Sequence, residues 1–203
     1  MTTSAAEKQA QVIQLADRRL DNASIARGLI EGDARAAEAL YDRFGTKVNR
    51  LVWRLLGADS EHDDLVHTVF VHVLSSIEKL RNPDALEDWI TGITVNTVRR
   101  EIRSRKYRKI FVFSGEYQDS RPSSCDSEKQ LIVMRLFEVL NKMKTEDHIV
   151  FVLRFIERNT LGEVAVAGGY SLATAKRRVA HAKKEFVKRA KKDTVLSAVF
   201  RDM

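Results

Sequence analysis

Hydrophobic and polar residues alternate along most of the chain with the period of an α-helix. Between residues 33 and 56, apolar side chains recur at steps of three and four, so they share one face of a helix. Segments 59–80 and 86–109 begin in the same way, and a shorter helix is predicted over 24–31. Four helices with short connections predict one compact bundle. Ser24 and Asp33 are the expected N-caps of the first two helices, and Gly57 is the expected end of the second.

The helical period stops at residue 111 and returns near residue 131. The stretch 111–130 holds five serines, a glycine and a proline, which is typical of a linker. Helices are then predicted over 131–143, 146–157, 161–167 and 172–186. The last two flank the sequence Gly168-Gly169-Tyr170-Ser171. A tight glycine-containing turn followed by a serine N-cap indicates a helix-turn-helix.

The chain is therefore predicted to be all-α, with two helical domains. Only two prolines and nine glycines interrupt its 203 residues. The predicted parts are a polar extension (1–22), a four-helix domain (23–110), a flexible linker (111–130), a helix-turn-helix domain (131–192) and a tail (193–203). In the tail, Val195, Leu196, Val199 and Phe200 form a small apolar stripe. It predicts a short helix packed on the second domain, with a segment that docks on a partner as the alternative.

Positive charge is concentrated in two segments. Residues 96–110 carry a net charge of +6, and residues 171–192 carry +8. The whole chain carries +7, so the remaining residues carry −7. Two basic patches on an otherwise acidic protein indicate a nucleic-acid-binding protein with two contact sites. Taken alone, the first patch is also compatible with a solvated helix end, where cations suit the helix dipole.

Each basic segment places its polar residues on one helical face. In 86–109 that face holds Asn96, Arg99, Arg100, Arg103 and Tyr107. Guanidinium groups pair with phosphates, amides read base edges and rings stack on unpaired bases. In the last helix, the residues expected to face the core are Leu172, Ala175, Val179, Ala182 and Phe186. The opposite face carries Ala173, Arg177, His181, Lys184 and Lys188, as expected of a recognition helix.

The sequence gives little support to an enzyme. The lone cysteine, Cys125, offers no metal-ligand spacing, and we expect no cofactor or metal. His67 and His72 are five residues apart, so on a helix they diverge instead of converging on one ion. No run of residues has the length of a signal peptide core or a membrane span, so a cytoplasmic protein is expected.

Three motifs resemble those of bacterial RNA polymerase sigma factors of the extracytoplasmic-function type, in the sigma-70-like family. DDLVHTVFVHVL at 63–74 is similar to the helix that binds the polymerase clamp. WITGITVNTVRREIRSR at 89–105 is similar to the −10 helix. LGEVAVAGGYSLATAKRRVAHAKKEF at 161–186 is similar to the −35 helix-turn-helix. The resemblance implies a sigma-2-type bundle and a sigma-4-type helix-turn-helix domain.

The resemblance also implies roles for individual residues. The positions that match the clamp-binding face are Asp64, Leu65, His67, Thr68 and Phe70. Those that match the −10 element are Asn96 for the flipped base, Arg99, Arg100, Arg103 and Lys106 for the backbone, and Arg81, Asn82 and Asp84 in the loop that shapes the base pocket. Those that match the −35 major groove are Lys176, Arg177, Ala180, His181 and Lys184.

The chain departs from the family pattern at a few positions. His67-Thr68 stands where Gln-Glu is usual, and Arg100 replaces a frequent Asp. Ala167-Gly168 stands where a bulky pair is usual, so a loosely packed turn is expected.

The implied partners follow from these roles. They are core RNA polymerase, through the clamp helices of its largest subunit and the flap of its second subunit, duplex promoter DNA and the single-stranded −10 non-template strand. The resemblance also admits an anti-sigma factor, and no membrane insertion is expected. The alternative is a helix-turn-helix regulator that binds an operator without polymerase. It accounts for residues 131–192 but leaves the helices over 61–80 and 89–105 unexplained.

Overall fold

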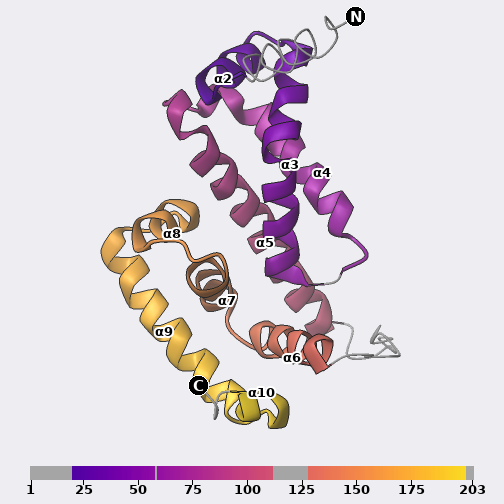
Figure 1. The fold of residues 1–203 in the computed structure, drawn as a ribbon, viewed down its shortest axis with the longest axis vertical. Coiled ribbons are helices and arrows are strands. Elements are labelled where there is room, and N and C mark those ends of the chain that lie inside the picture. Colours follow the sequence, from indigo (N-terminus) through magenta and orange to yellow (C-terminus); the bar gives the residue numbers. More distant parts are fainter. Residues whose placement is uncertain (1–19, 58, 112–127, 200–203) are drawn as a thin grey trace, which may run out of the picture.

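The computed structural model describes residues 20–57, 59–111 and 128–199, with the side chains of 107–111 and 199 left out (Figure 1). Within these ranges every regular element is a helix, which confirms the prediction of an all-α fold. The extension predicted over 1–22 and the linker predicted over 111–130 lie mostly outside the described residues. Their inner edges are helical, because α2 starts at Asn22, α5 includes Phe111 and α6 starts at Glu128.

The N-terminal half is the predicted four-helix bundle. It consists of α2 (Asn22–Ile30), α3 (Ala34–Leu56), α4 (His62–Ser76) and α5 (Leu86–Phe111). The long helix α3 packs against the other three, and α4 also packs against α5. Two 3₁₀ turns, Ile77–Lys79 and Pro83–Ala85, connect α4 to α5.

Capping of the first helices agrees with the sequence except at one position. Asp33 accepts from the Arg35 N–H at 2.9 Å and begins α3, and Gly57 ends that helix at φ 81°. The first helix is capped by Asp21, whose Oδ1 accepts from the Ser24 N–H at 2.7 Å, and not by Ser24 as predicted. Both residue types suit an N-cap, and Asp21 lies three residues before the N–H that it satisfies.

The C-terminal half consists of five helical elements. They are α6 (Glu128–Asn141), α7 (Thr145–Phe151) continuing as π-helix over Val152–Ile156, α8 (Leu161–Gly168), α9 (Leu172–Ala190) and α10 (Thr194–Val199). Helix α9 packs on α6, α7 and α8, and the Phe151 and Phe186 rings stack at 4.1 Å between centroids. Helix α10 packs on α6 and buries Leu196, as predicted for the tail.

The turn between α8 and α9 has helix-turn-helix geometry. Thr160 and Glu163 form a capping box at the start of α8, Gly169 adopts φ 70°, and Ser171 caps α9. The prediction of a loosely packed turn around Gly168 is wrong. A Cβ added at Gly168 would lie 2.3 Å from the ring of Tyr170, so this ring fills the space that a bulky side chain would otherwise take.

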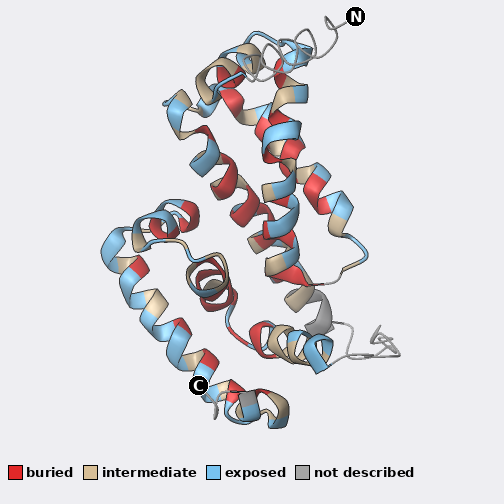
Figure 2. Cartoon of the chain, in the orientation of Figure 1, coloured by how far each residue is buried: buried red, intermediate tan, exposed pale blue. Residues whose placement is uncertain are grey.

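The two halves pack against each other. Helix α5 contacts α7 and α8, and α3 contacts the π-helical segment (Figure 1). Arg54 of α3 pairs with Glu157 at 2.6 Å. Figure 2 shows buried residues on the inward faces of helices from both halves, and they belong to one hydrophobic cluster. This arrangement holds the basic part of α5 beside the helix-turn-helix.

Candidate nucleic-acid and polymerase interfaces

Helix α5 turns one face to the core and the opposite face outward. Leu86, Ile90, Val95, Val98 and Ile102 are buried, while the side chains of Asn96, Arg100 and Arg103 are exposed. The amphipathic pattern therefore fixes which side of α5 can meet a ligand, and that side contains the predicted −10 residues.

Arg99 of this face is bonded to the C-terminal half. One of its terminal nitrogens, Nη2, donates to the Gly168 carbonyl at 3.0 Å and to the Tyr170 hydroxyl at 3.3 Å. Its Nε lies 3.1 Å from the Glu146 carboxylate, and its Nη1 donates to the Asn96 side chain. Arg99 thus joins α5 to α7 and to the turn before α9.

Arg103 and Lys106 make similar contacts one and two turns further along. Arg103 Nη2 donates to Glu146 Oε1 at 2.7 Å, and Lys106 Nζ donates to the Met143 carbonyl at 2.6 Å. Burial lowers the pKa of Lys106, and the positive charge of Arg189 adds to this. Three of the four predicted backbone-holding cations therefore contact the C-terminal half, whereas Arg100 has no ion-pair partner among the described residues.

The predicted base-pocket loop lies at the other end of α5. Arg81, Asn82 and Asp84 are exposed there, and the Asn82 side chain accepts from the Asp84 N–H at 3.1 Å. Ten helical residues separate Leu86 from Asn96, a rise of about 15 Å. The structure therefore places this loop on the same domain as Asn96 but does not bring the two side by side.

Arg105 belongs to a structural cluster that sequence reasoning counted only as positive charge. It pairs with Asp59, with Glu61 at 2.9 Å and with Glu101 at 2.7 Å. The hydrogen bond from Arg105 holds the pKa of Asp59 below its usual value. The cluster ties the C-terminal part of α5 to the segment just before α4 and engages the guanidinium of Arg105 within the bundle.

Helix α9 exposes all five predicted −35 residues. Lys176, Arg177, Ala180, His181 and Lys184 lie on its outer side, and Ala175, Ala182 and Phe186 are buried as expected. His181 Nδ1 also lies 3.2 Å from the Asp147 carboxylate of α7. The prediction that Leu172 faces the core is wrong, since it is 58% exposed. At the first position of α9 a side chain has neighbours on one side only, and Tyr170 fills the adjacent turn.

The predicted polymerase-binding residues of α4 divide into two groups. Leu65 and Phe70 are 9% and 7% exposed, and the Phe70 ring packs 5.1 Å from the Tyr41 ring centroid. Asp64 and His67 are exposed, and the Thr68 hydroxyl donates to the Asp64 carbonyl at 2.8 Å. Leu65 and Phe70 therefore hold α4 on the bundle and cannot form its outer face.

Sequence reasoning missed two exposed apolar residues on α4. Val71 is 47% exposed and Leu74 is 44% exposed. With Asp64 and His67 they follow steps of three, four and three, which makes one continuous outer stripe, here called the α4 stripe. The available signal was that both residues fall outside the buried stripe formed by Val66, Val69, Val73 and others.

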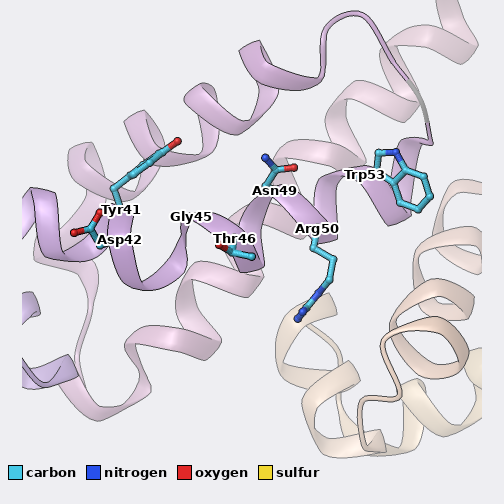
Figure 3. Close-up of a pocket in the computed structure, with 7 residues that line it drawn as sticks. All are labelled: Tyr41, Asp42, Gly45, Thr46, Asn49, Arg50 and Trp53. Atoms are coloured by element: carbon cyan, nitrogen blue, oxygen red, sulfur yellow. The ribbon is translucent and has the colours of Figure 1, made fainter. Parts of the chain in front are cut away.

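An open groove runs along the outer side of α3. Its lining residues are Tyr41, Asp42, Gly45, Thr46, Asn49, Arg50 and Trp53 (Figure 3). Tyr41 and Trp53 lie at its two ends, and Arg50 points towards the C-terminal half, 3.9 Å from Glu157. No group of histidine, cysteine or carboxylate side chains in the described ranges could hold a metal ion.

Comparison with known families places the bundle. The sigma-70 region 2 family matches residues 40–108, from the middle of α3 through the basic part of α5. RNA polymerase sigma factor SigV of Bacillus subtilis is 29% identical over 135 residues, which cover 66% of this chain and 79% of SigV. About a third of the chain thus matches sigma-70 region 2, and the chain is similar to RNA polymerase sigma factors, one of them of the extracytoplasmic-function type.

Further relatives agree with this similarity. The sigma factor SigE of Mycolicibacterium smegmatis, itself of the extracytoplasmic-function type, is 24% identical over 147 residues, which cover 70% of this chain and 56% of SigE. Among solved structures, CnrH in complex with the cytosolic domain of CnrY aligns with a TM-score of 0.60 and 20% identity. That alignment covers 85% of this chain and 99% of CnrH. The sigma factor RpoE of Bartonella quintana, bound to the anti-sigma factor NepR, aligns with a TM-score of 0.54 and 18% identity, covering 73% and 92% of the two chains.

The match to sigma-70 region 2 and the similarity to sigma factors favour a polymerase subunit over an operator-binding regulator. The family match covers α4 and the basic half of α5, the two elements that a helix-turn-helix regulator leaves unexplained. In the described ranges, no helix combines the length and apolar character needed to cross a lipid bilayer.

Proposed function

We propose that this sigma factor binds core RNA polymerase through α4, recognises the −35 element with α9 and the −10 element with α5, and promotes promoter melting. The observation that carries the proposal is the presence of two separate basic helix faces, one on each half of the chain. The α9 face is exposed, whereas the α5 face exposes Asn96, Arg100 and Arg103 and is partly covered by the C-terminal half. Two duplex or single-stranded contacts on one protein match the needs of a promoter with two elements.

The α5 face suits a single strand whose bases are unstacked. Extracting a base from a duplex costs a few kcal/mol, so a protein that captures it must offer both a base contact and phosphate contacts. The Asn96 side chain is exposed for the first, and Arg99, Arg100, Arg103 and Lys106 follow it along the helix for the second. Arg81, Asn82 and Asp84 lie on the loop that the family uses to shape the base pocket.

The α9 face suits the major groove of duplex DNA. Lys176, Arg177 and Lys184 are exposed on one side of a helix whose N-terminus is fixed by the Ser171 cap. Arg and Lys side chains contact guanine edges and phosphates, and Ala180 leaves room for close approach to the groove. His181 lies on the same face and can contribute to binding after leaving Asp147.

The α4 stripe suits a protein partner. It combines the exposed apolar residues Val71 and Leu74 with Asp64 and His67. Apolar centres with a polar rim are typical of protein interfaces, and the resemblance assigns this helix to the clamp helices of the largest polymerase subunit. The C-terminal half is assigned to the flap of the second subunit in the same way.

An anti-sigma factor is a further proposed partner. Two sigma factors of similar fold have been solved with bound partners, CnrY for CnrH and NepR for RpoE. A cytoplasmic protein without catalytic activity or cofactor fits these roles.

The decisive experiment uses purified core polymerase. The chain should co-elute with core polymerase in the absence of DNA and should produce run-off transcripts from a subset of genomic fragments. Asn96→Ala should keep its thermal stability and its binding to core polymerase, because an exposed amide contributes little to folding. Promoter opening, followed by permanganate reactivity of thymines, should fall by the worth of a base contact, about 1–3 kcal/mol.

Two results would contradict the proposal. Failure to bind core polymerase, together with sequence-specific duplex binding by the chain alone, would favour the operator-binding regulator. Loss of thermal stability in Asn96→Ala would mean that the amide holds helices together and does not meet a base.

A further inference from the structure

The α7–α8 side of the C-terminal half covers part of the face of α5 that is assigned to the −10 element. Arg99, Arg103 and Lys106 all bond to groups of the C-terminal half, at Gly168, Glu146 and Met143. These contacts join residues 37 to 69 positions apart in the sequence. The face is therefore engaged within the chain itself before any nucleic acid is present.

Glu146 is the central acceptor in this contact. Its carboxylate lies 3.1 Å from Arg99 Nε and 2.7 Å from Arg103 Nη2, and it accepts a hydrogen bond from the Tyr170 hydroxyl. The Glu146 side chain is only 19% exposed. We call Glu146 with these three partners the Glu146 clasp.

The chemistry of the clasp is that of a phosphate contact. A carboxylate and a phosphate both present a pair of anionic acceptor oxygens that a guanidinium group can meet with two N–H donors. The two arginines that Glu146 holds are among those assigned to the DNA backbone. One carboxylate therefore occupies the positions where phosphate oxygens would bind.

Tyr170 strengthens the same contact from the helix-turn-helix side. Its ring lies 4.9 Å from the Arg178 guanidinium carbon and 5.9 Å from that of Arg99. Gly168 permits this placement because it lacks a Cβ that would meet the ring. The turn that orients α9 thus also contacts α5 through Arg99.

We propose that the Glu146 clasp holds the free sigma factor in a closed form in which Arg99 and Arg103 of the −10 face are withheld from DNA, and that this contact must open before promoter melting. The inference rests on the proposed function of the α5 face. Because the clasp is partly exposed and consists of a few polar contacts, it closes the molecule reversibly. Opening exposes the −10 face and frees α9 to move away from α5.

The test compares Glu146→Gln with Glu138→Gln in the full chain. Glu138 lies on α6 and pairs with Arg135 at 2.9 Å, away from α5, so both variants lose one negative charge but only one loses the clasp. Small-angle scattering should give a larger radius of gyration for Glu146→Gln than for the control. Its affinity for fluorescein-labelled oligodeoxythymidine, without polymerase, should rise about three- to tenfold over the control.

A second substitution locates the gain. Adding Arg103→Ala to Glu146→Gln should remove most of the increase in oligodeoxythymidine binding, because Arg103 is a cation that Glu146 holds in the closed form. Tyr170→Phe keeps the ring beside Gly168 and removes only the hydroxyl, so it should produce a smaller change in the same direction. Equal melting temperatures for Glu146→Gln and the control exclude unfolding as the cause.

The outcomes separate the two proposals. If Glu146→Gln equals Glu138→Gln in both size and DNA affinity, the clasp is wrong. If Glu146→Gln expands but binds DNA no more tightly than Glu138→Gln, the proposal that the clasp masks a DNA-binding face is wrong. Failure of the proposed function would instead appear as absent run-off transcription by the wild-type chain with core polymerase, independent of either variant.

Discussion

His148 makes the fold sensitive to acid through a single buried side chain. It lies in α7 with no exposed surface. Burial lowers its pKa to about 3, and the charge of nearby Lys106 contributes in the same direction. In the unfolded chain a histidine titrates near 6.5. Below this pH the unfolded state therefore binds a proton that the folded state does not bind. The free energy of unfolding therefore has its full contribution from His148 above pH 6.5 and decreases as the pH falls towards 3.

We expect His148→Gln to remove most of this acid sensitivity. The wild-type chain should lose up to roughly 1.4 kcal/mol of unfolding free energy for each pH unit below 6.5 through this residue alone. The variant should be less stable than wild type at pH 7.5 but should lose less between pH 6.5 and 5. Urea unfolding at the three pH values measures this, with His67→Gln on the exposed side of α4 as the control. Parallel losses in wild type and His148→Gln would contradict the prediction.

The burial or exposure of residues was predicted well where only one side of a helix is apolar. It was predicted poorly where apolar residues lie on both sides of a helix. Asn96 and the five α9 residues are exposed as expected, because each lies opposite a complete apolar stripe. Leu65 and Phe70 were placed on the outer side by resemblance to a motif, whereas burial puts them inside. Since α4 carries apolar residues on both sides, the sequence does not tell which of them meets a partner.

Helical elements were predictable because their ends carry strong local signals. Asp33, Gly57 and Ser171 act as caps as expected from residue type. The π-helical stretch after Phe151 was not foreseen, since its apolar residues fit an α-helical period almost equally well. Local sequence also does not show whether a residue at the end of a helix has a neighbouring element to pack against. Leu172 is an example, since it was expected to face the core and is exposed.

At the scale of elements, α4 and α9 should separate polymerase binding from DNA binding. Replacing Val71 and Leu74 by Ser should weaken binding to core polymerase by about 1–3 kcal/mol, because exposed apolar side chains at an interface centre lose their burial. Binding of the −35 duplex should not change. Replacing Arg177 and Lys184 by Ala should do the reverse and should reduce the salt dependence of duplex binding.

The two variants serve as controls for each other. Co-elution with core polymerase and anisotropy of labelled promoter duplex are measured on both proteins. Equal losses in both assays for either variant would show that its helix does not have the separate role assigned to it.

The arrangement of the whole molecule was the least predictable feature. The sequence predicted two helical units, but nothing in its periodicity indicates that Arg99 reaches Gly168 and Tyr170, about 70 residues away. Such contacts depend on where two folded surfaces meet, and any of several cations on α5 has the chemistry to make them. The same limit explains why Arg105 could not be told from its neighbours before its partners Asp59 and Glu61, which precede α4, were known.

At the scale of the whole molecule, the closed form should persist when the chain is cut between its halves. A protease site inserted after residue 120 allows the two fragments to be separated and titrated against each other. Their affinity should be weak and salt-dependent, because ion pairs such as Arg54–Glu157 and Arg103–Glu146 contribute to the contact and are screened at high ionic strength. Glu146→Gln in the C-terminal fragment should weaken association about three- to tenfold relative to Glu138→Gln.

In the intact chain the connection between the halves raises their effective concentration to the millimolar range, so a contact with a millimolar Kd is enough to close the molecule. The fragments must therefore associate with a Kd no weaker than about this range if closure is a property of the contact itself. Isothermal titration at high fragment concentration measures it. Absence of association there would mean that the surfaces seen together on α5, α7 and α8 do not attract each other, and the closed form would have no energetic basis. Association that is unchanged by Glu146→Gln would instead assign closure to the apolar contact between α5 and α8 and leave the carboxylate without a role.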